Sequence, residues 1–151
     1  MQTSSRMCVG VLALALAWSI PVSAQSPTAA GRLKVASGSA LIVRQGTSIP
    51  AQTGQVVFES DALRTGADGR IGVTLKDDTR VSIGPNSELR LERFVYAPAE
   101  GGFALALKFV RGVAAYVSGR IAKLAPDAIR LETPSAIVGV RGTSLAVRVE
   151  P

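Results

Sequence analysis

The sequence has 151 residues, with 17 Lys and Arg against 11 Asp and Glu, no His and a single Cys, so its formal net charge is +6. The usual zinc ligands, a disulfide within the chain and the His-dependent catalytic constellations are therefore excluded. The cations are spread singly, without a basic tract, which argues against nucleic acid as a partner and is compatible with a diffuse attraction to anionic envelope polymers.

The first 24 residues have the pattern of a secretory signal peptide. Arg6 precedes an uncharged run over residues 7–20, and residues 22–24 supply the small side chains that signal peptidase requires. The apolar run is shorter than the roughly 20 residues that span a bilayer, which favours cleavage over a membrane anchor. Cys8 precedes the run and has no lipobox before it. We therefore expect a periplasmic or secreted chain that begins at Gln25 and keeps no stable membrane anchor.

Residues 25–30 are small and polar and predict a flexible leader, with the folded domain over residues 31–149. Two short strands are predicted at the start of this domain, around Gly38. The inward-facing residues expected of these strands are Leu33 with Val35 and Leu41 with Val43.

The alternation typical of strands is clearest after Arg70. Apolar and polar residues alternate over residues 71–76, and Asp77-Asp78 then predicts a turn into a second strand at residues 81–83. These segments predict a β-hairpin.

A central strand is predicted over residues 103–110, because both of its faces are apolar. Gly112 separates it from a further strand over residues 113–117, and one helical turn could form within residues 118–128, where Pro126 limits its length. The whole pattern predicts about ten short strands and no amphipathic helix, so the fold class is all-β. Such strands could stack as a β-solenoid-like roll or close as a β-sandwich.

The segment from Thr133 to Val149 contains the most distinctive pattern. Thr133-Pro134 ends one extended run, and Arg141-Gly142-Thr143 separates the apolar residues 136–140 from residues 145–149. Pro134 cannot donate to a strand ladder, and Gly142 permits a sharp bend. This closing motif, residues 133–143, resembles that of the FecR-like periplasmic domain family. The upstream matches are Gly54, Asp61-Ala62-Leu63-Arg64-Thr65 and Ile83-Gly84-Pro85-Asn86.

The resemblance covers roughly residues 31–149, and it favours the solenoid-like roll. In the family, the domain is often the periplasmic part of a regulator that senses an outer-membrane receptor and signals through a membrane helix to a sigma factor. This chain differs, with no anti-sigma segment before the apolar run and no receptor-facing domain after Pro151. We therefore expect a soluble adaptor or sensor.

Arg141 is the polar residue of most interest in the closing motif. Its guanidinium is expected to be a structural anchor held by a carboxylate such as Asp61 or Glu132, and the alternative is contact with an anionic group of a ligand. Asp61 itself is interpreted as a turn cap. The residues expected to be structural or to contact a partner are Asp61, Arg64, Thr65, Thr133, Pro134, Arg141, Gly142 and Thr143.

The remaining candidates for chemistry are carboxylates, since no nucleophile elbow or phosphate loop is present. Asp77-Asp78 and the pair Glu88 and Glu92 could be proposed for a hydrolase, but adjacent acids in a turn point apart, and no acid run has calcium-loop spacing. We therefore predict a non-enzymatic binding or sensing module without metal or cofactor, whose partner is an envelope protein. A binder of anionic envelope polymer is the alternative, and a carboxylate-based hydrolase is third.

Overall fold

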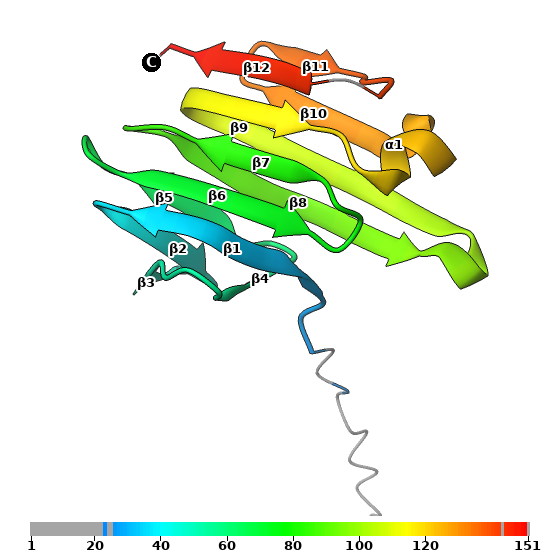
Figure 1. The fold of residues 1–151 in the computed structure, drawn as a ribbon, viewed down its shortest axis with the longest axis horizontal. Helices are drawn as coiled ribbons and strands as arrows, with labels where there is room; N and C mark the ends of the chain where they lie inside the picture. The colour runs from blue at the N-terminus through cyan, green and yellow to red at the C-terminus, as the bar shows by residue number, and fades with distance from the viewer. Residues whose placement is uncertain (1–22, 24–25, 143, 151) are drawn as a thin grey trace, which may run out of the picture.

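The computed structural model describes residue 23 and residues 26–142 and 144–150. These residues form one curled β-sheet with a short helix at one end (Figure 1). In chain order the elements are β1 (Ala29–Ser37), β2 (Ala40–Arg44), β3 (Thr47–Pro50), β4 (Val56–Phe58), β5 (Ala62–Thr65), β6 (Arg70–Leu75), β7 (Arg80–Ile83), β8 (Glu88–Ala97), η1 (Pro98–Glu100), β9 (Gly102–Val117), α1 (Arg120–Leu124), η2 (Pro126–Ala128), β10 (Ile129–Thr133), β11 (Ala136–Val138) and β12 (Ser144–Val149).

The sheet folds into two layers that share β9. The front layer has the strand order β4-β1-β6-β7-β9-β12, and the back layer has the order β3-β2-β5-β8-β9-β10-β11. In Figure 1, β9 runs along the back, bends at the left edge and returns in front. The first half of β9 pairs with β8 and β10, and its second half pairs with β7 and β12.

The all-β prediction is confirmed, with twelve strands in place of about ten. The solenoid-like stack is corrected by the topology. Neighbouring strands run antiparallel except for β9 and β10, and the sheet curls into a half-barrel around one core instead of repeating coils. The resemblance favoured the wrong arrangement because antiparallel strands with tight corners produce the same short apolar runs as solenoid coils.

β9 corrects the predicted break at Gly112. The strand continues from Gly102 to Val117, and Gly112 adopts a φ of +87° at the point where β9 passes from the back layer to the front layer. A Cβ at this position would lie 2.6 Å from Ser87 Cα and would also overlap Ser87 Oγ. Glycine therefore permits a bend inside one strand, where the sequence pattern predicts a boundary between two.

Other corners lie beside this bend and are hydrogen-bonded to one another. Gly66 N donates to Ser39 O at 2.8 Å, and Asn86 N donates to Gly66 O at 2.9 Å. Ser87 Oγ accepts from Val113 N at 2.9 Å, which joins the corner between β7 and β8 to β9. These bonds satisfy backbone groups that the corners remove from the strand ladders.

The core lies between the two layers. The predicted alternation of β6 is confirmed, because Ile71, Val73 and Leu75 are all buried. In β1, Leu33 is buried, but a bulge between Leu33 and Val35 turns Val35 outward and leaves it 50% exposed. The expectation that Val35 faces the core is therefore wrong, because the extra residue of a bulge reverses the facing of those that follow.

Tyr116 is the largest fully buried side chain, and its hydroxyl lies near Thr79 and the Asp77 carboxylate. Burial, reinforced by the nearby Asp77 carboxylate, raises the pKa of Tyr116 to about 12. The folded protein therefore holds this proton more tightly than the unfolded chain, whose tyrosines titrate near 10.

The raised pKa of Tyr116 predicts a loss of stability at high pH. The stabilisation that comes from this raised pKa is fully present below about pH 10 and is lost as pH rises toward about 12. We expect this loss to lower the free energy of unfolding by about 2 kcal/mol. Urea unfolding at pH 9 and pH 12 should show this extra loss in the parent and not in Tyr116→Phe. An equal decline in both proteins would contradict the assignment.

Candidate functional site

The closing motif forms β10, β11 and the passage to β12. Thr133 ends β10, and its hydroxyl accepts a hydrogen bond from Ala136 N at 3.0 Å across the turn. Pro134 lies exposed in this turn, where its missing N–H removes no ladder bond. The two residues thus start β11 antiparallel to β10.

β11 is an exposed apolar edge strand. It pairs only with β10 among the described residues, and Ile137 is 69% exposed. Val138 is also exposed, whereas Val140 is buried and joins the core. β12 pairs only with β9 in the described part of the chain, so both layers end in an open edge at the top of the molecule in Figure 1. An open apolar edge offers backbone and side-chain contacts to another strand.

Arg141 and Gly142 lie between these two edges. Arg141 is exposed and lines a shallow pocket with residues such as Asp127 and Val140. Gly142 has a φ of +53°, which suits the bend that the sequence predicts there. Thr143 lies outside the described residues. The anchoring role of Arg141 stays a prediction.

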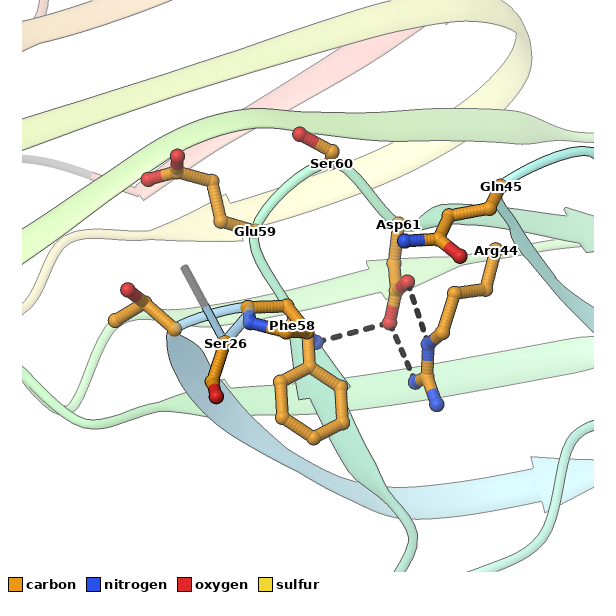
Figure 2. A pocket seen from close by; sticks show the side chains of 9 residues that line it. Ser26, Arg44, Gln45, Phe58, Glu59, Ser60 and Asp61 are labelled. Atoms are coloured by element: carbon orange, nitrogen blue, oxygen red, sulfur yellow. Dashed lines mark hydrogen bonds and ion pairs between the residues drawn. The ribbon is translucent and has the colours of Figure 1, made fainter. Parts of the chain in front are cut away.

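Asp61 lies in a separate cluster with Arg44 (Figure 2). Arg44 donates to both carboxylate oxygens of Asp61, from Nε to Oδ1 at 2.9 Å and from Nη2 to Oδ2 at 2.7 Å. Phe58 N donates to the same carboxylate at 2.9 Å, and the Arg44 guanidinium lies 4.5 Å from the centre of the Phe58 ring. Asp61, one of the two carboxylates named as partners for Arg141, is thus occupied by Arg44.

The pair is positioned by strand ends. Arg44 is the last residue of β2, and Asp61 directly precedes β5, which pairs with β2. Asp61 is 1% exposed, and the hydrogen bonds that Arg44 donates to its carboxylate raise the pKa of Arg44. A buried carboxylate that accepts three hydrogen bonds stabilises the turn after β4.

The pair lines a pocket of about 640 Å³. Ser26 and Thr28 of the segment before β1 also line it, as do Glu59 and Ser60 of the turn after β4. The Glu59 carboxylate accepts a hydrogen bond from Phe94 N at 2.9 Å. Sequence reasoning missed Arg44, because it is one of many single cations and only its partner across the sheet distinguishes it.

Arg64 and Thr65 hold the back layer together. Arg64 Nε lies 3.1 Å from Glu88 Oε2, and Arg90 Nε lies 3.2 Å from Oε1 of the same carboxylate. Thr65 is buried, and its hydroxyl donates to Gly84 O at 2.6 Å and accepts from Ser87 N at 2.9 Å. Both residues make structural contacts between strands, and Glu88 is engaged by two guanidinium groups.

The acids considered for a hydrolase do not converge. Asp77 is fully buried and accepts hydrogen bonds from Thr79 and Ile121, whereas Asp78 is exposed and pairs with Arg120 at 2.9 Å. The two neighbouring carboxylates thus point to different environments. Across residues 26–142 and 144–150, no cluster of three or more potential metal ligands is found. Within the same residues, no helix has the length and apolar character needed to cross a bilayer.

Comparison with known proteins gives one family. The model described as FecR protein matches residues 61–151, which include β5 through β12 and so the open edges of β11 and β12. No curated protein and no solved structure matches the chain.

Proposed function

The chain belongs to the FecR protein family, and from this membership we propose that it is an exported, non-enzymatic sensing module of the cell envelope that acts by binding another protein. The family supports a signalling or sensing role. The signal-peptide pattern of residues 1–24 supports export to the periplasm or beyond.

The observation that carries the proposal is the open edge of β11. A strand that pairs on one side only leaves a row of backbone donors and acceptors for an extended segment of a partner. Ile137 and Val138 would add apolar contact beside that ladder. Natural edge strands are commonly protected by lysine or proline, and neither occurs within Ala136–Val138.

The proposed partner is an envelope protein that adds a strand to β11. A photoreactive residue at exposed Ser135, in the turn beside β11, is expected to crosslink one protein in intact cells. The crosslink should be reduced at least tenfold in an Ile137→Lys and Val138→Lys double variant, because charged side chains block pairing at an edge. Mass spectrometry of the crosslinked band identifies the partner.

The matched control is Leu41→Lys. Leu41 is also an exposed apolar residue of the back layer, but β2 is paired on both sides, so the crosslink should persist. A crosslink that survives the double variant, or one that contains only a second copy of this chain, would overturn the proposal.

A further inference from the structure

A row of small side chains crosses the outer surface of the front layer. These residues lie on five neighbouring strands and face each other in register. The register partners are Val35 with Gly72, Gly72 with Ser82, Ser82 with Ala115, and Ala115 with Ala146. Since strands lie about 4.8 Å apart, the row extends roughly 19 Å across the sheet.

The row forms the floor of a shallow trough of about 430 Å³. Arg70, Pro85 and Val113 are among its walls. A Cβ added at Gly72 would lie 3.4 Å from Val35 Cβ, an ordinary contact, so the fold does not require glycine at this place. The small side chains leave open a channel that runs perpendicular to the strands.

The strands of this outer surface carry cations and no acids, and the exposed Asp78 after β6 lies beside Arg32 and Lys34. No acid occupies an outward-facing position of β1, β6, β7, β12 or the second half of β9. None of the cations there forms an ion pair with a described residue, in contrast to Arg90 and Arg130 of the back layer, which pair with glutamates. The outward-facing cations are Arg32, Lys34, Arg70, Arg80 and Arg148.

We propose that this trough, which Arg70 lines and the other outward-facing cations flank, binds a linear anionic polysaccharide that carries repeated carboxylates. Arginine forks pair with carboxylates in a bidentate manner, and four of the five cations are arginines. The outward positions hold no aromatic residue for base stacking, which disfavours single-stranded nucleic acid. This surface is separate from the β11 edge, so the polysaccharide would bind in addition to the proposed protein partner.

Polygalacturonate is the probe, because each of its sugars carries a carboxylate. Its methyl ester has the same sugar chain without the negative charge and is the control polymer. The full chain is expected to bind polygalacturonate and to bind the ester at least tenfold more weakly in calorimetric titration. An Arg70→Glu and Arg148→Glu double variant should lose at least tenfold in affinity. An Arg93→Glu and Lys123→Glu double variant makes the same charge change at exposed positions outside the trough and should stay within about twofold.

Ala115→Trp fills the channel without changing charge and should weaken binding at least fivefold, with Ser82→Tyr as a second variant if the first does not fold. Circular dichroism and thermal unfolding check that each protein is folded. Equal losses in the two charge variants, or full binding by a folded filled-channel variant, would overturn the proposal. It would also fail if single-stranded DNA or phosphatidylglycerol vesicles bound as tightly as polygalacturonate with the same dependence on Arg70 and Arg148.

Discussion

Replacing Gly112 by alanine is expected to lower the free energy of unfolding by about 4 kcal/mol. The φ of +87° strains any L-residue, and the new Cβ would overlap Ser87, whose Cα is 2.6 Å away. Ser87 cannot move aside easily, because its N–H donates to Thr65 Oγ1 at 2.9 Å and its hydroxyl accepts from Val113 N. Urea unfolding of the two proteins measures the difference.

Gly101→Ala is the matched control for this prediction. Gly101 also has a positive φ, of 68°, but a Cβ there would meet nothing within 4 Å. Gly101→Ala should lower the free energy of unfolding by about 1 kcal/mol, which is the cost of a left-handed conformation alone. Similar losses for both glycines would show that β9 does not depend on close contact at its bend.

An Asp77→Asn variant is expected to lose about 3 kcal/mol of stability. The buried carboxylate accepts from Thr79 Oγ1 at 2.6 Å, Thr79 N at 3.2 Å and Ile121 N at 3.3 Å, and so ties the turn after β6 to the start of α1. An amide would place a donor opposite these donors and leave at least one of them unsatisfied in the core.

The neighbouring Asp78→Asn variant provides the comparison. Asp78 is exposed, its partner Arg120 is exposed too, and asparagine tolerates the φ of 67° at this position. It should therefore unfold at nearly the same urea concentration as the parent. If Asp77→Asn were equally mild, the carboxylate would not be the structural tie between β6 and α1.

The sequence by itself determined the local features of the fold. Alternation over residues 71–76 predicts the buried face of β6, because successive side chains of a strand point to opposite sides. Pro126 correctly limits α1, which ends at Leu124 before η2 begins. The closing motif also indicates the family, because the motif is recognised by the order of its residues along the chain.

The tertiary structure decided what depends on distant residues. A glycine between two apolar runs predicts a break, and only the contact with Ser87 shows that Gly112 bends one strand. With many acids and cations in the sequence, spacing does not select Arg44 as the partner of Asp61. The trough from Val35 to Ala146 exists because strand register aligns residues on five strands, and register is set by bulges, corners and core packing across the whole chain.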